Sequence, residues 1–557
     1  AAALYIPEEI DGHEVVAIGD GAFKNRTDLK TVMIPDSVTK ISGMAFYGCS
    51  GLGNVTLSKN LKSLGSSTFG NCDGLTQIEI PKSLERAGDD YFASYAPGAF
   101  SGCKNLKHIS FEEGITEIAY KLFSNCTGLE EITIPDTVTT IKGNAFYECS
   151  NLSKVKLSEN LTVIEADAFQ ECNSLQNIEL PEGLSEIKDR AFYQCSNLKE
   201  IKIPDSVTKI EGSAFYECKK LQNVTLSKNL ESLGSSTFGN CDGLTQIEIP
   251  KSLERAGDDY FASYAPGAFS GCKNLKNVSF EAGTTVIAYK LFSNCTGLEK
   301  ITIPDTVTTI KGYAFYECSN LKEIQIGNGL KEIGDSVFYE CTSLQKVLFP
   351  DTVNSMGTSI FYNCINLTEV HLPNIRQNIM ANTFYNCKKL TTINFPSTLT
   401  TIGDSAFYGC ESLPEAILPS GLEEIESNAF KNCKSLKKAV VPDTVSSIGS
   451  SAFYGCEALT DITLGSKLKK IDSQTFYGCI ALPSIVIPYN VTTIGDSAFV
   501  NCTKLTQITV PRNTASIESN AFSYPRKMTM YGPSGCYAQT YANGKGIKYV
   551  AQDIHAT

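Results

Sequence analysis

The stretch Leu129–Asn151, LEEITIPDTVTTIKGNAFYECSN, decides the fold, because the chain repeats it about twenty-two times. The phenylalanine of its A-F-x-x-C segment recurs at 23-residue steps from Phe100 to Phe238 and from Phe269 to Phe522, after three earlier copies. A cysteine follows three residues later in twenty of these units. A fixed period of this length is typical of a solenoid and argues against a string of separate globular domains.

Within the unit, the pattern L-x-x-I-x-I predicts a short strand with one buried face, because Ile132 and Ile134 alternate with polar residues. Pro135 has no N–H for a ladder and therefore fits the end of that strand. The segment P-D-T-V then predicts a turn that brings two further aliphatic side chains back inward. The A-F-x-x-C segment closes the coil through a short helical or 3-10 turn.

One such coil buries too little apolar surface to fold alone, so we expect each coil to stack on identical neighbours. The predicted fold is mainly β: a right-handed solenoid of about 22 repeats of 23 residues, with a parallel sheet on one face and short turns or 3-10 segments on the other. Both ends need caps. We expect an atypical first repeat at residues 1–34, the regular solenoid at 35–522 and a C-terminal cap at 523–557.

The consensus L-x-x-I-x-I-P-x-x-V-x-x-I-x-x-x-A-F-x-x-C resembles that of the BspA-like leucine-rich repeats, which are found on surface proteins of anaerobic bacteria and some parasitic protists. The resemblance covers residues 4–522, and the closing stretch MYGPSGCYAQTYANGKGIKYVA is similar to terminal caps of such proteins in Gram-positive gut bacteria. It implies a secreted or cell-surface protein that binds host extracellular or surface proteins or glycans, or other microbes. It implies no shared catalytic residue and no single shared ligand.

The composition narrows the classes of partner. The net charge of −12 argues against nucleic acid and anionic membranes, and no apolar run is long enough to insert into a membrane. Neither an export signal nor an anchor is recognisable, so we expect the signal to have been removed. We find no catalytic, cofactor-binding or metal-binding motif and predict a monomeric protein that is not an enzyme.

The cysteines predict a buried ladder of free thiols. Each repeat cysteine occupies the same inward position and meets identical neighbours one coil away, where parallel side chains do not aim at one another. Cys536 lies outside this series and is the best candidate for a reactive thiol.

Two near-identical stretches, residues 56–107 and 225–276, indicate a duplication with an offset of 169 residues. Each contains the eight-residue insert DDYFASYA. Insertions in solenoids often form binding loops, so the insert aromatics are candidate ligand-binding residues; the alternative is that they fold inward to fill the space left by Ala87 and Ala256. They are Tyr91, Phe92, Tyr95, Tyr260, Phe261 and Tyr264.

A second candidate surface comes from the outward middle residue of each strand. This position is polar through most of the chain but becomes aliphatic in the later repeats, which predicts an apolar strip for ligand binding. The alternative is neutral drift, because β-branched residues favour strands in any case. The residues are Leu348, His371, Ile417, Val440 and Val486.

Eleven units read F-Y-x-C, which predicts a column of stacked tyrosines. Two interpretations remain open: a structural cover for the phenylalanines, or an aromatic platform for carbohydrate. Taken together, the sequence favours a non-catalytic recognition or adhesion scaffold. The alternative is a spacer or substrate-targeting module of a larger wall protein or enzyme.

Overall fold

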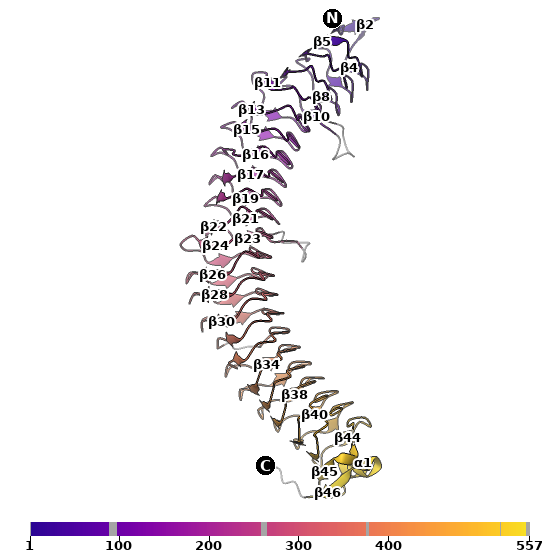
Figure 1. Cartoon of the computed structure of the whole chain (residues 1–557), viewed down its shortest axis with the longest axis vertical. Helices are drawn as coiled ribbons and strands as arrows, with labels where there is room; N and C mark the ends of the chain where they lie inside the picture. The colour runs from indigo at the N-terminus through magenta and orange to yellow at the C-terminus, as the bar shows by residue number, and fades with distance from the viewer. Residues whose placement is uncertain (1, 89–96, 258–264, 375–377, 524, 553–557) are drawn as a thin grey trace. The chain divides into compact units, whose positions relative to one another are not determined.

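The computed structural model describes residues 2–88, 97–257, 265–374, 378–523 and 525–552. It is mainly β, with 2% helix, and its parallel strands stack into a solenoid of about 23 turns, which confirms the predicted fold class. The chain divides into two compact units, Ala1–Glu281 (unit 1) and Ala282–Thr557 (unit 2). Within each unit, successive coils lie one upon the next (Figure 1).

Each coil has three sides, as the coil from Leu129 to Asn151 shows. The sheet side is the strand β13 (Glu131–Thr133), and a second, two-residue strand β14 (Thr140–Ile141) follows the proline turn. The third side, the turn side, runs through Ala145–Cys149 and contains turns only. The sequence predicted the first strand and the turns, but it did not predict that the residues around Ile141 form a parallel sheet of their own.

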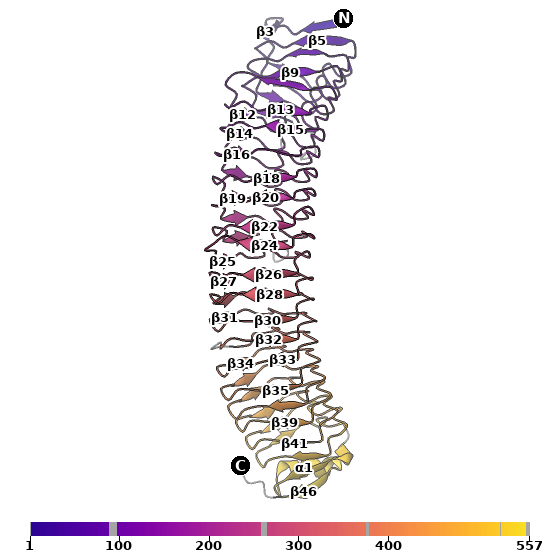
Figure 2. The same ribbon diagram turned by 60° about the vertical axis from the view of Figure 1, so that its left-hand side comes forward.

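The strands of unit 1 fall into these two columns (Figure 2). The long strands are β1 (Ala2–Tyr5), β5 (Leu29–Met33), β7 (Asn54–Thr56), β9 (Gln77–Ile80), β11 (His108–Phe111), β13, β15 (Lys154–Lys156), β18 (Glu200–Lys202), β20 (Asn223–Thr225), β22 (Gln246–Ile249) and β24 (Asn277–Phe280). The short strands are β4 (Ala17–Ile18), β6 (Lys40–Ile41), β8 (Ser63–Leu64), β10 (Arg86–Ala87), β12 (Glu117–Ile118), β14, β16 (Val163–Ile164), β17 (Glu186–Ile187), β19 (Lys209–Ile210), β21 (Ser232–Leu233) and β23 (Arg255–Ala256).

Unit 2 repeats the arrangement. Its long strands are β26 (Lys300–Ile303), β28 (Glu323–Ile326), β30 (Lys346–Leu348), β32 (Glu369–His371), β33 (Thr392–Ile393), β35 (Glu415–Ile417), β37 (Lys438–Val440), β39 (Asp461–Thr463), β41 (Ser484–Val486), β43 (Gln507–Thr509), β45 (Thr529–Gly532) and β46 (Lys548–Ala551). Its short strands are β25 (Val286–Ile287), β27 (Thr309–Ile310), β29 (Glu332–Ile333), β31 (Ser355–Met356), β34 (Thr401–Ile402), β36 (Glu424–Ile425), β38 (Ser447–Ile448), β40 (Lys470–Ile471), β42 (Thr493–Ile494) and β44 (Ser516–Ile517).

The core consists of continuous columns of like residues. In the coil from Leu129 to Asn151, the fully buried side chains are Leu129, Val138, Ile141, Phe146 and Cys149. The phenylalanine rings stack from coil to coil, with ring centroids 5.1 Å apart between Phe146 and its neighbour Phe169. Because like side chains meet like, each coil supplies the apolar surface that its neighbours need, and stability accumulates along the stack.

On the turn side, successive backbone amides donate alternately to a carbonyl of the next coil and to a carbonyl three residues earlier in the same coil. The amides of Asn144, Phe146 and Glu148 donate to carbonyls of the next coil at 2.8 to 3.0 Å, while the residues between them donate three residues back. This alternation requires left-handed backbone at Asn144 and Glu148, whose φ angles are both 56°. Asparagine tolerates that region better than most residues. The segment is therefore a run of tight turns and not a 3-10 helix.

In unit 1 the long strands join mainly in pairs of coils, apart from the three-stranded sheet β1-β5-β7. A coil whose strand ends in Ile-Pro, such as Ile134-Pro135, bonds to a following coil that ends in Leu-Ser, such as Leu157-Ser158. The coil with the proline turn is also bonded to the following coil through Asp136. Its carboxylate accepts a hydrogen bond from the amide N–H of Glu159 at 3.1 Å. The same carboxylate bond recurs between Asp36 and Lys59 and between Asp205 and Lys228, at 2.8 and 2.9 Å.

The two ends of the chain depart from the repeat. Near the start, β2 (Glu9–Ile10) and β3 (His13–Glu14) form an antiparallel hairpin around Asp11-Gly12, both with positive φ. Near the end, η1 (Pro525–Lys527) precedes β45. The helix α1 (Tyr537–Lys545) follows β45 in the sequence and is followed by β46. The helix continues through Asn543-Gly544 to Lys545 and ends at Gly546, which has the left-handed φ of 67°.

Candidate binding surfaces

The sheet side is the solvent-facing surface to which every repeat contributes in the same way. Each long strand points two side chains outward, and in β13 these are the exposed Glu131 and Thr133 on either side of the buried Ile132. Because neighbouring strands are in register, for example Thr133 beside Lys156, the outward side chains form two parallel rows. The character of this side therefore depends on substitutions that leave the core unchanged.

Between coil pairs of unit 1 the sheet side opens. In the described part of the chain, no backbone hydrogen bond joins β11 to β13, or β15 to the segment 177–180. The inward residues just before these openings, Ile109 and Val155, are half-exposed, whereas Ile132 within a pair is buried. The openings thus produce recesses with aliphatic floors.

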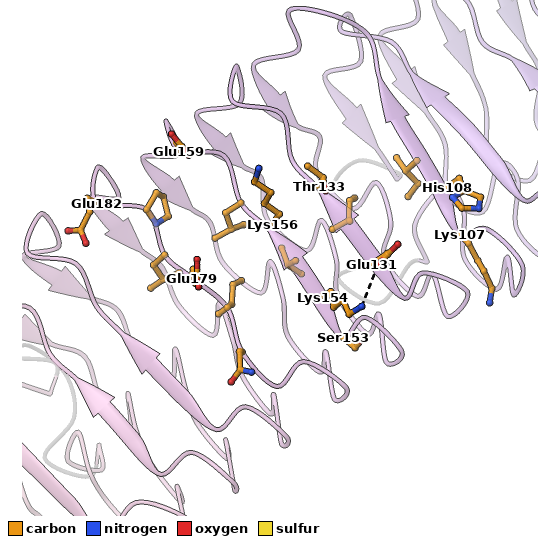
Figure 3. A pocket seen from close by; sticks show the side chains of 18 residues that line it. Lys107, His108, Glu131, Thr133, Ser153, Lys154, Lys156, Glu159, Glu179 and Glu182 are labelled. Carbon is orange, nitrogen blue, oxygen red and sulfur yellow. Dashed lines mark ion pairs between the residues drawn. The ribbon is translucent and has the colours of Figure 1, made fainter.

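The larger recess, which we call the charged groove, encloses about 810 Å³ and extends from Lys107 to Glu182 across four coils (Figure 3). Lys154 lies 3.9 Å from Glu131 in an ion pair drawn in Figure 3. Lys156 forms no ion pair within the described residues. Glu159 and Glu182 lie on the turns that follow the strand position, and Glu179 lies on the coil beyond Lys156.

A second recess, the neutral groove, encloses about 390 Å³ between β20, β22 and β24. Its lining is mostly amide and hydroxyl side chains, including Asn223, Gln246 and Asn277, with Glu248 as the acidic member. It follows another Leu-Ser coil, and Val224 before the opening is half-exposed. The two grooves therefore share an origin but differ in the number of charged side chains, with three lysines and four glutamates lining the charged groove and one glutamate lining the neutral groove.

In unit 2 the five predicted strip residues lie on the sheet side as expected, but they are not all neighbours. Ile417 on β35 lies beside Val440 on β37. The side chain of Ile417 is 46% exposed, and that of Val440 is half-buried. Val486, on β41, is 65% exposed. Leu348, 48% exposed, lies beside His371 on β30 and β32, several coils away. The apolar surface is thus the neighbouring pair Ile417 and Val440, with Val486 two coils further on beyond Thr463 and on a separate ladder. We call these three residues the apolar cluster, and Leu348 is separate from it.

The predicted aromatic sites at the two inserts, Tyr91, Phe92, Tyr95, Tyr260, Phe261 and Tyr264, lie outside the described residues. Ala87 and Ala256, which precede them, are fully buried in the short-strand column. The choice between a binding loop and an inward-folded loop stays a prediction.

The tyrosine column forms its longest stack in unit 2. The rings of Tyr339, Tyr362, Tyr385 and Tyr408 follow one another with centroids 4.5 to 4.6 Å apart and nearly parallel planes. Burial raises the pKa of Tyr339 to about 12. Burial, followed by the neighbouring tyrosines, also raises the pKa of Tyr385. Because each ring covers the face of the next, the faces that a sugar would stack on are occupied. This geometry favours the structural interpretation.

Lys431 takes the next place in this column. Its Nζ lies 5.9 Å from the ring centroid of Tyr408 and 4.7 Å from that of Tyr454. The ammonium group therefore continues the stack through cation–π contacts.

All 21 cysteines are free and buried. In the ladder the thiol does more than fill space: Cys149 Sγ donates to the carbonyl of Phe123 in the preceding coil at 3.0 Å, and Cys172 donates to that of Phe146 at 3.2 Å. Burial raises the pKa of the Cys149 thiol to about 12. The sequence did not reveal this bond, although a residue that is both small and a weak donor at an inward position is a usable signal.

Cys536 is outside the ladder, as predicted. It is only 6% exposed, however, and its Sγ lies 3.3 Å from Tyr549 Oη. Burial makes it a poorer candidate for a reactive thiol than its sequence position indicated.

Two buried lysines were missed. Lys121 and Lys290, in the duplicated motif A-Y-K-L-F, are 1% and 4% exposed. Their Nζ atoms lie 5.6 Å from the ring of Tyr120 and 5.5 Å from that of Tyr289, respectively. The preceding tyrosine in each copy was the available signal.

Charge is distributed unequally between the units. Unit 1 carries 26 Lys and Arg against 38 Asp and Glu, whereas unit 2 carries 22 of each, so the net charge of −12 belongs to unit 1. In the described part of the chain no three His, Cys, Asp or Glu side chains gather as metal ligands, and no helix has the length and apolarity of a membrane span.

Stacked coils with one column of long parallel strands and a second column of short ones, asparagine-rich turns and repeating Leu, Ile and Phe positions define a leucine-rich-repeat solenoid. Six overlapping matches to the BspA type leucine rich repeat region together span residues 16–536. The chain therefore belongs to the BspA type leucine-rich-repeat family, which confirms the resemblance. Proteins of this class generally bind proteins and are generally not catalytic.

Several crystal structures are similar to this chain. A leucine-rich repeat protein from Bacteroides ovatus is 26% identical, with 78% of this chain and 91% of that one covered and a TM-score of 0.45. A leucine rich cell surface protein from Faecalibacterium prausnitzii is 22% identical over 86% and 91%, with a TM-score of 0.28. The pneumococcal vaccine antigen PcpA is 18% identical over 90% and 96%, with a TM-score of 0.30. A search of curated protein sequences gives no match.

Proposed function

We propose that the protein is a non-catalytic recognition or adhesion scaffold, secreted or displayed on a cell surface, that binds a host or microbial protein. The observation that carries the proposal is the apolar cluster of Ile417, Val440 and Val486 on the sheet side of unit 2. The strands that bear it are stable parts of parallel ladders, so these side chains are held in place before a partner arrives. Exposed aliphatic residues held rigidly on a sheet are suitable contact residues.

Charge supports the same surface. Unit 2 has no net charge, and Lys438 of β37 is neutralised by Asp461 at 3.5 Å. A protein partner therefore approaches this side without strong repulsion of either sign. Of the three strands that carry these residues, β37 has a ladder partner on each side, so contact there falls to the side chains.

The test is binding of the whole chain to immobilised extracellular-matrix proteins and to epithelial cells, followed by substitution. We expect Ile417→Lys with Val486→Lys to weaken binding by at least about tenfold, since charges replace the apolar contact. The matched control is Thr302→Lys with Gln325→Lys, which adds the same charge to exposed positions of the same row in unit 2. Equal binding by both double variants would overturn the proposal for this surface.

The insert aromatics are a second proposed contact, tested by Tyr91→Ala, Phe92→Ala, Tyr260→Ala and Phe261→Ala together. Loss of binding at an unchanged melting temperature supports a contact role, and a large fall in melting temperature supports an inward-folded role. A chain that binds no cell or matrix protein in any form would favour the alternative function, a spacer or targeting module of a larger protein.

A further inference from the structure

We propose that the charged groove of unit 1 is a binding site for an extended polypeptide segment that carries both acidic and basic side chains. The inference rests on the proposed recognition role but uses a different surface from the apolar cluster of unit 2. Its basis is the paired-coil architecture, which creates recesses on the sheet side wherever one pair ends and the next begins.

The first reason for a polypeptide is the backbone that the groove leaves available. Strand β15 bonds to β13 on one side, but within the described residues it has no ladder with segment 177–180 on the other. Amide N–H and carbonyl groups on that edge can therefore pair with the amides of a peptide, as exposed strand edges do in other peptide-binding proteins.

The second reason is the arrangement of charge. Lys154 and Lys156 project from β15, whereas Glu159 and Glu182 lie on the turns beyond the strand ends and Glu179 on the next coil (Figure 3). Lys154 pairs with Glu131 at 3.9 Å and Glu182 pairs with Lys202 at 3.0 Å, whereas Lys156, Glu159 and Glu179 form no ion pair within the described residues, so charge of both signs stays available in one recess. A ligand with acidic groups over the lysines and basic groups over the glutamates complements them, and polypeptides supply both signs readily.

The third reason is the floor. Ile109 and Val155 occupy inward positions but are half-exposed at the two openings. Small aliphatic side chains of a bound segment would cover them and gain apolar contact. The neutral groove has a similar opening at Val224 but lacks the lysines, so it provides a natural comparison within the same unit.

The probe is a fluorescent octapeptide with the sequence DDSTVSKK, compared with DKSTVSKD, which has the same composition but mixed charge at each end. Anisotropy is measured with the whole chain at low and high salt. We expect the first peptide to bind about three- to tenfold more tightly than the second, and the difference to vanish at high salt.

Two double variants locate the site. Lys154→Gln with Lys156→Gln, and Glu159→Gln with Glu179→Gln, are each expected to weaken the first peptide by about three- to tenfold. Glu248→Gln in the neutral groove is the control and should leave binding unchanged. Equal affinity for the two peptides, or equal losses in all three variants, would overturn the inference.

The two proposals fail separately. If groove variants lose the peptide while cells are still bound through Ile417 and Val486, the groove is a second site and both proposals stand. If cell binding is absent but the peptide is bound at the groove, the function proposed for unit 2 fails and the groove remains. If the groove variants bind the octapeptide like the unmodified chain, the groove inference fails regardless of cell binding.

Discussion

In unit 1 the long strands join mainly in twos, whereas in unit 2 they run through sheets of five, three and four strands. Both units nevertheless bury the same columns of Leu, Ile, Phe and Cys. The turn after the strand accounts for part of the difference, although the opening between β11 and β13 follows Phe111-Glu112. Coils ending in Leu-Ser follow each Pro-Asp coil in unit 1 at residues 57, 157 and 226, and each is followed by an opening. A change outside the core thus sets how neighbouring coils join.

Within its described residues, the long-strand column of unit 2 has two interruptions. One, between β39 and β41, follows Leu464-Gly465 in place of a proline turn. The other, between β33 and β35, follows a proline turn. On the opposite side of β33, towards β32, the side chain of Asn394 accepts from the N–H of Leu372 and donates to its C=O, at 2.7 and 2.9 Å. A side chain has taken over bonds that a backbone ladder makes elsewhere.

The largest expected effect tests what the units share. Phe169→Ala in unit 1 and Phe384→Ala in unit 2 each remove a fully buried ring stacked on both sides. We expect each to lower the free energy of unfolding by about 3–5 kcal/mol, measured by urea denaturation followed by circular dichroism. Since the columns are equivalent, the two losses should agree within about 1 kcal/mol. A loss confined to one variant would show that the cores differ.

High pH tests the tyrosine stack of unit 2 next. Burial raises the pKa of Tyr339 to about 12 and raises that of Tyr385, so the folded stack favours the neutral phenol. Its contribution to stability is complete below the unfolded pKa near 10 and is lost as pH rises from about 10 towards 12. Absorbance at 295 nm should show these tyrosines ionising only as the structure unfolds. Reversible ionisation of every tyrosine near pH 10, with native circular dichroism, would contradict the stack.

Within that stack, Tyr362→Ala should cost more than Tyr147→Ala. Tyr362 contacts parallel rings on both sides, at 4.6 and 4.5 Å, whereas the column positions beside Tyr147 hold Ser124 and Gln170. Two lost ring pairs predict an additional loss of about 1–3 kcal/mol in unfolding free energy. Tyr362→Phe keeps the ring and is the control. Equal losses at both positions would mean that stacking adds nothing to burial.

Hydrogen exchange should reveal the coil pairs directly. The amides of Ile34, Ile134 and Ile203 donate to the next coil at 2.8 to 3.0 Å, whereas those of Leu57, Leu157 and Leu226, at the same repeat position, have no such acceptor among the described residues. We expect the leucine amides to exchange at least about tenfold faster, or about 1.4 kcal/mol less protection. Mass spectrometry of short peptides measures this, and uniform protection at all six would refute the pairing.

The sequence predicted the solenoid because a fixed period, strand alternation and a strand-ending proline are all local signals. It placed Ile417, Val440 and Val486 on the sheet side for the same reason. The grooves were harder to foresee, because they depend on bonds between coils and not on the content of one coil. The signal was present in Pro135-Asp136 followed by Ser158-Glu159, but its meaning becomes visible only when Asp136 is seen to bond to the next coil.

The smallest expected effect concerns the outward rows. In unit 2, Lys346 pairs with Glu369 at 2.8 Å across two laddered strands, while in unit 1 Lys154 lies 3.9 Å from Glu131. Both pairs are exposed, so Lys346→Gln should cost only about 0.2–1 kcal/mol, and less at high salt. Lys154→Gln should cost less still, because its pair is longer. If stability falls by more than this at Lys346, the outward row contributes to the fold itself; if it does not, the row is free to vary with the partner, as a recognition surface requires.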